Sequence, residues 1–407
     1  MKKLNKYPIV IIGGSIAAIS FIRTLRQQEN DKKILLIYGE DRLPYKRTKI
    51  NKNMVRGFEK DDFLIADNQW YADNKVDLIN GWVDAIDLTN HVVSTKKGAQ
   101  FAYEKLLLAT GAASVLPRIS GIEMQDIHKV QNAFDVEKLL LETKTKQSYL
   151  IIGGGVEGIE TADQLHRKGK DVTIVGRMKY PMQKLFPTEF MEDLVNGMLK
   201  IGVEVYNGVS ISSIKKVNGI FETRLKNETR HFDVIVGCTG AVPNIVLAKN
   251  AGLNTANGIV VDEWMQTSDD DVLAAGDVAQ HKNGEVTGLW HAAEHQGKLA
   301  ALNLYEKVER HTLPPYRLKT EVFGQFLFSA AYEGIFPEKF EIIKEADKDI
   351  LRWLYFKDGV LKSVVMRGDK DRAKVYQQAL MEAWDKETTL KKIPLPVPIV
   401  FSFGAGF

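Results

Sequence analysis

The sequence predicts an α/β fold made of two similar halves and followed by a C-terminal α+β domain. An apolar run that ends in a glycine turn at residues 7–18 recurs at residues 149–158, about one domain length further along the chain. Each turn leads into helical spacing of apolar residues, and each helix leads into a short apolar strand, 34–38 or 172–175. Strand, glycine turn, helix and strand in this order form the Rossmann-like unit. We therefore expect two Rossmann-like domains of the three-layer ββα type.

The remaining elements give the expected domain boundaries. Further strand-like segments follow the repeats, at 91–94, 106–109, 203–206, 232–236 and 272–277. Beyond residue 312 the pattern changes to strands with hairpin turns at 340–343, 351–356 and 360–366, and to a helix over 374–384. We expect one Rossmann-like domain from residues 1–120 and 245–312, a second from 121–244, an α+β domain from 313–390, and a hydrophobic, proline-containing tail at 391–407.

Composition excludes several classes of protein. The chain has 407 residues, of which 44% are hydrophobic and 26% are charged, so it is neither a disordered chain nor a disulfide-stapled miniature. Its net charge of +3 gives no reason to expect a nucleic-acid partner. The single cysteine, Cys238, is expected to be a buried structural thiol in a cytoplasmic protein, because it can form neither an internal disulfide nor a cysteine-pair metal site. We expect no metal site, and no apolar stretch reaches the ~20 residues of a membrane span.

The second glycine turn predicts a dinucleotide site. Gly153 suits the tight turn, Gly155 leaves room beside a pyrophosphate, and Gly158 lets the following helix pack closely on the strand. The acidic residue expected after the second strand is replaced by Gly176, followed by Arg177 and Lys179. A basic turn without a carboxylate accommodates a 2′-phosphate, so we expect NADPH over NADH. The alternative is a solvated basic turn, with which NADH would serve equally.

The first glycine turn is less complete. It has Gly13, Ser15 and Ala18 at the three positions, so only the turn glycine remains. Ser15 crowds the pyrophosphate slightly but can donate a hydrogen bond to it. Glu40, just beyond the second strand, is a candidate acceptor for ribose hydroxyls, and the alternative is a solvated turn carboxylate.

Seven ordered motifs in residues 7–370 resemble a known family. They lie at 13–18, 43–47 with Lys52, 107–112, 153–160, 240–244, 274–277 and 290–297. Together they resemble the two-dinucleotide flavoprotein reductases, in the branch of rubredoxin reductases, ferredoxin reductases and the flavin-binding part of nitrite reductases. The resemblance implies FAD on the first site, NAD(P)H on the second, and a C-terminal domain near the flavin and the partner. The further residues that it places on the cofactors are Arg47, Ala109, Thr110, Gly111, Gly240, Gly276, Asp277, Trp290 and His291.

The resemblance also implies roles within this set. Asp277 would accept a hydrogen bond from a hydroxyl of FAD, and Arg47 would contact its adenine or phosphate side. The segment 290–297 would open a helix aimed at the pyrimidine end of the flavin, with a dipole that stabilises negative charge there. We favour packing roles for His291 and His295.

Lys52 and Glu160 are the expected catalytic pair. The resemblance places such a lysine beside flavin N5, paired with the glutamate on the second glycine-turn helix. A buried lysine needs a counter-charge, and an ammonium near N5 favours the arrival of electron density there. The alternatives are a solvated Lys52 and a helix-surface Glu160.

The sequence also lacks a feature of close relatives. Disulfide-type members carry a redox cysteine beside the flavin, often just after the position matched by residues 47–52, and this chain has none there. Electrons that arrive as a hydride from NAD(P)H are therefore expected to leave FAD singly, to a small iron protein such as rubredoxin or a [2Fe–2S] ferredoxin.

Several alternatives to this function stay open. They are an NAD(P)H oxidase or nitrite-reductase-like component with a small-molecule acceptor, and a non-enzyme protein that senses flavin or nucleotide. A homodimer is compatible with the organisation of the chain. The tail is expected to dock on this subunit or a twin, or else to be offered to a partner.

Overall fold

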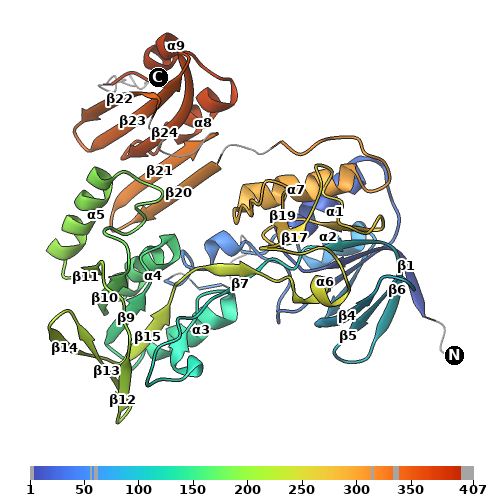
Figure 1. Cartoon of the computed structure of the whole chain (residues 1–407), viewed down its shortest axis with the longest axis horizontal. Helices are drawn as coiled ribbons and strands as arrows, with labels where there is room; N and C mark the ends of the chain where they lie inside the picture. Colours follow the sequence, from blue (N-terminus) through green and yellow to red (C-terminus); the bar gives the residue numbers. More distant parts are fainter. Residues whose placement is uncertain (1–3, 56, 59–62, 313–315, 333–338, 396–407) are drawn as a thin grey trace, which may run out of the picture. The chain divides into compact units, whose positions relative to one another are not determined.

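The computed structural model describes residues 4–55, 57–58, 63–312, 316–332 and 339–395 (Figure 1). The chain divides into two compact units. Unit 1 comprises residues 1–115, 131–136 and 240–314, and unit 2 comprises residues 116–130, 137–239 and 315–407. The tail that the sequence predicts to dock lies almost wholly outside the described residues, since residues 396–407 are not among them.

Unit 1 is built on a seven-stranded sheet in the order β3-β2-β1-β6-β5-β4, with β18 also paired to β6. The central strands are parallel, with Ile12 opposite Leu108 and Leu108 opposite Ala274, whereas β4 and β5 pair antiparallel. Its strands are β1 (Asn5–Ile12), β2 (Ile34–Tyr38), β3 (Val76–Asn80), β4 (Val83–Asp87), β5 (Val92–Thr95), β6 (Gln100–Leu108), β7 (Ala112–Ser114), β16 (Ala241–Pro243), β17 (Ile259–Val260), β18 (Val272–Ala274) and β19 (Ala279–Gln280). Its helices are α1 (Ile16–Gln27), η1 (Arg47–Lys49), α2 (Asn68–Asp73), α6 (Val246–Asn250) and α7 (Trp290–Leu302), and α3 (Ala133–Glu142) begins in unit 1 and ends in unit 2.

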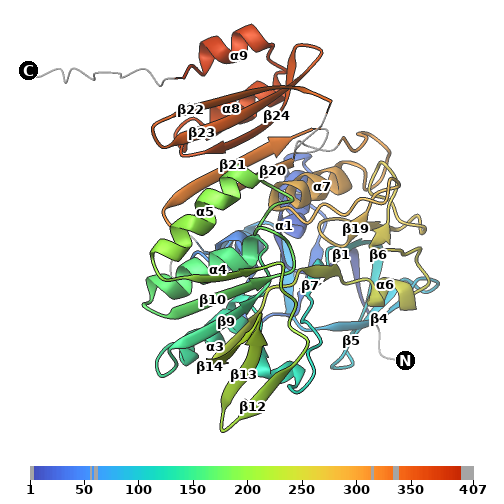
Figure 2. The same cartoon turned by 60° about the vertical axis from the view of Figure 1, so that its left-hand side comes forward.

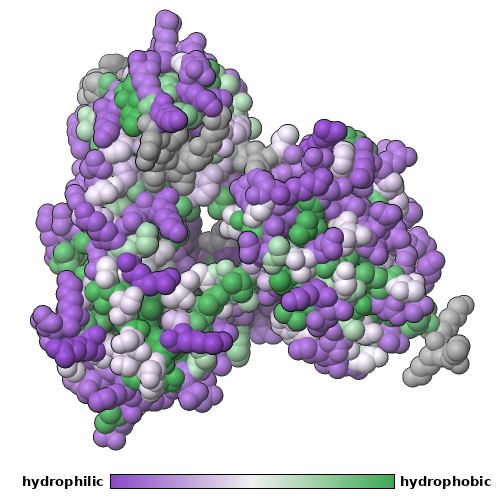
Figure 3. All heavy atoms as spheres, in the orientation of Figure 1, coloured by the Kyte–Doolittle hydropathy of each residue, from purple (hydrophilic) through white to green (hydrophobic). Residues whose placement is uncertain are grey.

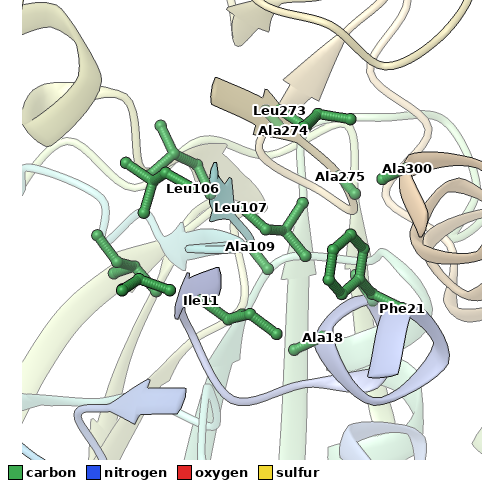
Figure 4. Close-up of a cluster of buried hydrophobic side chains, with 14 of the residues drawn as sticks. Ile11, Ala18, Phe21, Leu106, Leu107, Ala109, Leu273, Ala274, Ala275 and Ala300 are labelled. Atoms are coloured by element: carbon green, nitrogen blue, oxygen red, sulfur yellow. The ribbon is translucent and has the colours of Figure 1, made fainter. Parts of the chain in front are cut away.

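The core of unit 1 explains why its central strands read as continuous apolar runs. Strands that are covered on both faces bury every side chain, and β1 and β6 are buried at their carboxyl halves. Figure 4 shows the centre of this core, where Ile11 of β1 and Leu107 of β6 meet Phe21 of α1 and Ala300 of α7. The helices α1 and α7 pack closely, because Gly297 has no Cβ. An ideal Cβ there would lie 2.1 Å from the Ala17 carbonyl oxygen.

Unit 2 repeats the Rossmann-like plan. A five-stranded parallel sheet has the order β11-β10-β9-β15-β8, and a separate antiparallel sheet has the order β12-β13-β14. The elements are η2 (Met124–Asp126), β8 (Ile127–His128), β9 (Ser148–Ile152), α4 (Val156–Arg167), β10 (Asp171–Gly176), α5 (Thr188–Lys200), β11 (Glu204–Asn207), β12 (Ile214–Val217), β13 (Ile220–Leu225), β14 (Glu228–Phe232) and β15 (Val234–Gly237). The predicted α/β class with two Rossmann-like folds is confirmed.

The C-terminal part of unit 2 is an α+β domain, as predicted. Its antiparallel sheet has the order β20-β21-β24-β23-β22, and the helices α8 and α9 accompany it (Figure 2). The elements are β20 (Tyr316–Val322), β21 (Gln325–Ala331), β22 (Glu341–Asp347), β23 (Ile350–Lys357), β24 (Val360–Arg367), α8 (Ala373–Met381) and α9 (Lys386–Lys392).

The helix predicted around 374–384 is present as α8, but its carboxyl end comes earlier than predicted. It ends at Met381, because Ala383 has a φ of +51° and therefore cannot continue a right-handed helix. Trp384 instead turns into the core of the domain, where it is buried, and its ring N–H donates to Glu382 at 2.8 Å.

No helix among the described residues is both long enough and apolar enough to cross a membrane. The face of the molecule in Figure 3 is covered mainly by hydrophilic side chains, with apolar ones scattered among them.

Candidate active site

The first glycine turn of unit 1 is fixed by backbone packing. Gly13 has a φ of +110°, and an ideal Cβ there would lie 2.1 Å from the Ala109 carbonyl oxygen, so only glycine fits. Helix α1 begins after Ser15, whose side chain makes no capping hydrogen bond. The first N–H groups of α1 are therefore not capped by that side chain, and such a helix end can bind a phosphate. Ala18 is fully buried in α1.

Glu40 and Arg47, both predicted to contact FAD, lie in contact with each other. Glu40 follows β2 and accepts hydrogen bonds from Arg47 Nη2 and from the Tyr45 hydroxyl, the latter at 2.5 Å. Arg47 Nη1 also donates to the Gln131 carbonyl oxygen at 3.1 Å. Tyr45 is buried, and this burial raises the pKa of its hydroxyl above the ordinary value, so it serves as a donor.

The predicted residues 109–111 form a loop that is held by Asn244. The Asn244 side chain donates to the Thr110 carbonyl oxygen at 2.8 Å, and its backbone N–H donates to the Gly111 carbonyl oxygen at 2.9 Å. Gly111 and Gly240 both have positive φ, at +66° and +106°. Asn244 lies in the predicted motif at 240–244, which was the signal for it, but it was not predicted as a site residue.

Asp277 is the clearest candidate for a cofactor contact in unit 1. Gly276 precedes it with a φ of +85°, and an ideal Cβ on Gly276 would lie 3.2 Å from the Ala17 side chain of α1. Within the described part of the chain, the Asp277 carboxylate forms neither a hydrogen bond nor an ion pair. Burial raises its pKa, and the charge of Arg47 opposes that shift. A half-buried carboxylate without a partner, close to the start of α1, fits the hydroxyl groups of FAD.

Helix α7 begins at Trp290, as predicted for the segment 290–297. Its N-cap residue, Leu289, supplies no capping side chain, and Trp290 and His291 are both half-buried. The helix therefore presents an end that can stabilise negative charge, which the sequence analysis assigned to the pyrimidine end of the flavin.

A cluster of three histidines in unit 1 was not predicted. The rings of His281 and His311 stack with centroids 4.0 Å apart, and His295 lies 5.7 Å from His311. Gln296 accepts a hydrogen bond from Gly276 N–H at 2.7 Å, so its amide nitrogen faces His281 Nε2 at 3.0 Å. Burial lowers the pKa of all three imidazoles, and the two neighbouring rings contribute to lowering that of His311 to about 3.

Gln296 connects the loop before Asp277 to this cluster, because it contacts both Gly276 N–H and the His281 ring. His281 Nε2 must accept from Gln296, so the ring is neutral with its proton on Nδ1. His295 belongs to the predicted motif at 290–297, but His281 and His311 belong to no motif, so no sequence pattern indicated that the three rings cluster.

The second glycine turn, in unit 2, has the backbone geometry that the sequence predicts at each glycine. Gly153 has a φ of +128°, and an ideal Cβ there would lie 1.9 Å from the Cys238 carbonyl oxygen. Gly155 is the N-cap of α4, and an ideal Cβ on it meets nothing within 4 Å. A Cβ on Gly158 would lie 2.0 Å from the Gly153 carbonyl oxygen. The turn therefore has a tight backbone, an open centre and a closely packed helix.

The end of β10 carries exposed cations. Gly176 ends the strand, and the side chains of Arg177 and Lys179 are both exposed. The Lys179 ammonium lies 5.3 Å from the Tyr180 ring centroid. No carboxylate occurs in the sequence 176–183, so this turn can accommodate a phosphate.

Cys238 is buried directly behind this turn, as predicted. Burial raises the pKa of its thiol well above the ordinary value, and Glu157 adds to that shift. A protonated, buried thiol is a weak nucleophile, so Cys238 is not suited to relay electrons.

Lys52 and Glu160 lie in different units. Lys52 is exposed in the turns after η1 of unit 1, although the sequence analysis expected a buried lysine. Glu160 lies on α4 of unit 2, where its Oε1 accepts a hydrogen bond from the Thr320 hydroxyl at 2.8 Å. The pairing of Lys52 with Glu160 stays a prediction. Thr320 was missed, because the β-strand pattern around it carries no nucleotide-binding signal.

The chain is similar to known proteins. Residues 7–297 match the pyridine nucleotide-disulphide oxidoreductase family. The chain is 29% identical over 299 residues to an NADH-rubredoxin oxidoreductase of Clostridium acetobutylicum, covering 72% of this chain and 74% of the relative. It is 27% identical over 393 residues to a nitric oxide reductase FlRd-NAD(+) reductase of Escherichia coli, covering 95% of this chain and 99% of the relative.

A solved structure shares the fold of the whole chain. The ferredoxin reductase for the CYP199A2 system of Rhodopseudomonas palustris has a TM-score of 0.83 at 22% identity, covering 95% of this chain and 99% of that one. The family match spans well over half of the sequence, and the two glycine turns lie within it. The chain belongs to the pyridine nucleotide-disulphide oxidoreductase family and is a flavoprotein oxidoreductase that uses FAD and NAD(P)H.

Proposed function

We propose that the protein takes a hydride from NAD(P)H and passes the electrons one at a time to a small iron protein, either rubredoxin or a [2Fe–2S] ferredoxin. Two relatives support this acceptor by their names, an NADH-rubredoxin oxidoreductase and a FlRd-NAD(+) reductase. The chemistry of the chain supports it as well. Its one cysteine, Cys238, is buried with a raised pKa, so no thiol is suited to relay electrons.

The observation that carries this proposal is the pair of glycine turns with different linings. In unit 1, Gly13 and the start of α1 would hold the pyrophosphate of FAD, and the Asp277 carboxylate would accept its hydroxyl groups. In unit 2, Gly153 and Gly155 would hold the pyrophosphate of NAD(P)H at the start of α4. FAD, when bound, supplies the ability to accept a hydride and to release single electrons.

Lys52 and Glu160 complete the proposed machinery. We assign Lys52 to the flavin, where its ammonium would favour incoming negative charge, and Glu160 to the lysine as its counter-charge. Replacing either residue should slow flavin reduction by NAD(P)H. A rate that does not change in stopped-flow mixing would remove the residue from the mechanism.

An anaerobic experiment tests the proposed function. The FAD-loaded protein is reduced with NAD(P)H and then mixed with rubredoxin, with a [2Fe–2S] ferredoxin, with oxygenated buffer, with nitrite or with ferricyanide. We expect an iron protein to reoxidise the flavin much faster than oxygen does, and twice as many iron centres to be reduced as coenzyme molecules consumed. Fast reoxidation by oxygen or nitrite alone would support a small-molecule acceptor instead. No turnover with ferricyanide would favour a sensing protein.

We also propose NADPH as the preferred coenzyme. Arg177 and Lys179 are exposed after Gly176. The turn contains no carboxylate, which would repel a 2′-phosphate. The ratio of kcat/KM for the two coenzymes tests this, with an Arg177→Ser variant as comparison. Loss of a charge-assisted phosphate contact should lower kcat/KM for NADPH by roughly 10-fold and leave that for NADH unchanged. A clear NADH preference in the unaltered protein would contradict the proposal.

The remaining assignments follow the same plan. We propose that residues 1–120 and 245–312 are the FAD domain and 121–244 the NAD(P)H domain, and that the protein is cytoplasmic. We propose that the tail beyond Lys392 docks on the same subunit or on a twin, which would make a homodimer. Truncation at Lys392 tests this. Lost solubility supports docking, whereas loss of iron-protein reduction alone supports a partner contact.

A further inference from the structure

The hairpin β20–β21 of the C-terminal domain contacts helix α4 through two carboxylates. The Thr320 hydroxyl donates to Glu160 Oε1 at 2.8 Å, and the backbone N–H of Phe323 donates to Asp163 Oδ1 at 2.8 Å. Glu160 and Asp163 are three residues apart and therefore lie on the same face of the helix. Thr320 and Asp163 are each only 2% exposed, so these contacts are shielded from water.

The two contacts differ in kind. Asp163 anchors a backbone atom at the tip of the hairpin, where Phe323 has a φ of +50°. It also forms an ion pair with Arg167 at 2.8 Å and accepts from Gln164 at 3.1 Å. Thr320 contacts Glu160 through its side chain alone. Replacing its hydroxyl with a methyl group would therefore remove one hydrogen bond and leave the anchor at Asp163 in place.

We infer that Thr320 is a positioning residue, whose hydroxyl holds the Glu160 side chain in the orientation in which it serves hydride transfer. This inference rests on the proposed function of Glu160. A glutamate side chain has several rotatable bonds, and a hydrogen bond from a fixed neighbour restricts them. Thr320 is such a neighbour, because it is buried on β20 opposite Leu327 of β21.

The chemistry of the donor suits this role. A hydroxyl is neutral, so it orients the carboxylate without cancelling the charge that Glu160 would offer to a lysine. The contact also gives the C-terminal domain a direct part in the reaction rate, although the predicted nucleotide contacts lie outside that domain.

Four variants test the inference in the FAD-loaded protein. Thr320→Val removes the hydroxyl and keeps the shape, and Thr320→Ser retains the hydroxyl. Thr320→Ala forms a second pair with Thr320→Ser, which keeps the comparison usable if valine destabilises the fold. The matched control is Thr173→Val, because Thr173 is also a buried strand threonine that donates to a glutamate, Glu204, at 3.2 Å.

The first readout is anaerobic rapid mixing with NAD(P)H, which separates the limiting rate of flavin reduction from the Kd of the coenzyme. We expect Thr320→Val and Thr320→Ala to lower the limiting rate by roughly 10-fold, the lower end of what the loss of a hydrogen bond to a charged group costs. The coenzyme Kd should stay within roughly 2-fold, since the hydroxyl does not contact the coenzyme in this scheme. Thr320→Ser should restore most of the rate, and Thr173→Val should change neither quantity.

The second readout does not depend on activity. Crystal structures of ligand-free Thr320→Val should show the Glu160 carboxylate displaced from its position in the unaltered protein, and those of Thr320→Ser should show it in that position. An unchanged limiting rate together with an undisplaced Glu160 carboxylate in Thr320→Val would overturn the inference. Equal slowing in Thr320→Val and Thr320→Ser, with a lowered Tm in both, would also overturn it and indicate a structural role only.

Glu160→Gln in the same assay separates this inference from the proposed function. If Glu160→Gln leaves flavin reduction unchanged, the proposed role of Glu160 fails and the role of Thr320 fails with it. If Glu160→Gln slows reduction and Thr320→Val does not, only the role of Thr320 fails.

Discussion

The two glycine turns use the same device at their first position and different devices afterwards. Gly13 and Gly153 both have strongly positive φ, and a Cβ on either would overlap a carbonyl oxygen of the neighbouring strand end, that of Ala109 or of Cys238. At the third position Ala18 is tolerated and fully buried, whereas a Cβ on Gly158 would lie 2.0 Å from the backbone.

In unit 1 a glycine permits a close backbone approach at another position. Gly297 of α7 lies against α1, where a Cβ on this glycine would lie 2.1 Å from the Ala17 carbonyl oxygen. The turn in unit 1 thus has a second helix packed close to its own helix, and the turn in unit 2 is packed by its own helix and strand. A close backbone approach of the kind that Gly158 permits in unit 2 is therefore found in unit 1 at Gly297, outside the glycine turn.

The largest effect is expected from the shared first glycine. Gly13→Ala and Gly153→Ala each force a side chain into a positive φ and onto a carbonyl oxygen, which should cost about 3 kcal/mol or more locally. We expect Gly13→Ala to lose FAD, and Gly153→Ala to keep FAD while losing reduction by NAD(P)H. Flavin content and anaerobic bleaching measure the two outcomes. Loss of FAD in both variants, with intact folding, would mean that the two turns do not serve separate coenzymes.

At the third position, adding a methyl group to Gly158 should cost more stability than removing one from Ala18. Gly158→Ala should destabilise the protein by roughly 3 kcal/mol through overlap with the backbone, although alanine is the better helix former. Ala18→Gly should cost only about 1–2 kcal/mol, from helix propensity and one buried methyl group. Urea unfolding of the FAD-free proteins gives both values. A harmless Gly158→Ala would remove the distinction between the turns.

Asp277 is expected to make the stability of unit 1 depend on pH. Burial raises the pKa of Asp277, so its ionised form is the costly one in the ligand-free fold. That cost is present above the raised pKa and is relieved as the pH falls through it towards the ordinary value of 3.8. Asp277→Asn should therefore raise the Tm of the FAD-free protein at neutral pH.

The same substitution should weaken FAD binding by roughly 10-fold, because hydrogen bonds to a charged acceptor are lost. Melting curves across pH and equilibrium dialysis of FAD measure the two effects. A lower Tm together with unchanged FAD affinity would place Asp277 outside the cofactor site.

The smallest effect is expected at the second position. Exchanging the residues, with Ser15→Gly in one turn and Gly155→Ser in the other, should change the stability by less than about 0.5 kcal/mol, since a Cβ on Gly155 meets open space. Gly155→Ser should raise the Kd of NAD(P)H a few-fold by crowding the pyrophosphate. Calorimetric titration measures this, and an unchanged Kd would show that the second position does not set the room for the phosphate.

Local sequence signals predicted the fold and the glycine turns because these depend on short spacings. Strand, turn and helix around Gly13 and Gly153 lie within single stretches of chain, and the geometry of each glycine follows from its neighbours. The end of α8 was missed, because the residue with positive φ that follows it is Ala383 and not a glycine, which would have indicated the end of the helix.

The supporting contacts of the site could not be predicted in this way. The hydrogen bond between Gln296 and Gly276, the histidine cluster and the contact of Thr320 with Glu160 join residues from distant parts of the chain. Only tertiary packing brings these groups together. Asn244 lies between these cases, since it belongs to a recognised motif but acts by holding the loop at Thr110.

The most direct test of the account is an anaerobic titration of purified, FAD-supplemented protein with NADPH or NADH, followed by absorbance and repeated with Gly153→Ala. If the two turns bind separate coenzymes, the protein is yellow and one equivalent of coenzyme bleaches its flavin colour, whereas the Gly153→Ala variant stays yellow. A protein that takes up no FAD, or a variant that bleaches as fast as the unaltered protein, would contradict this separation of the coenzymes.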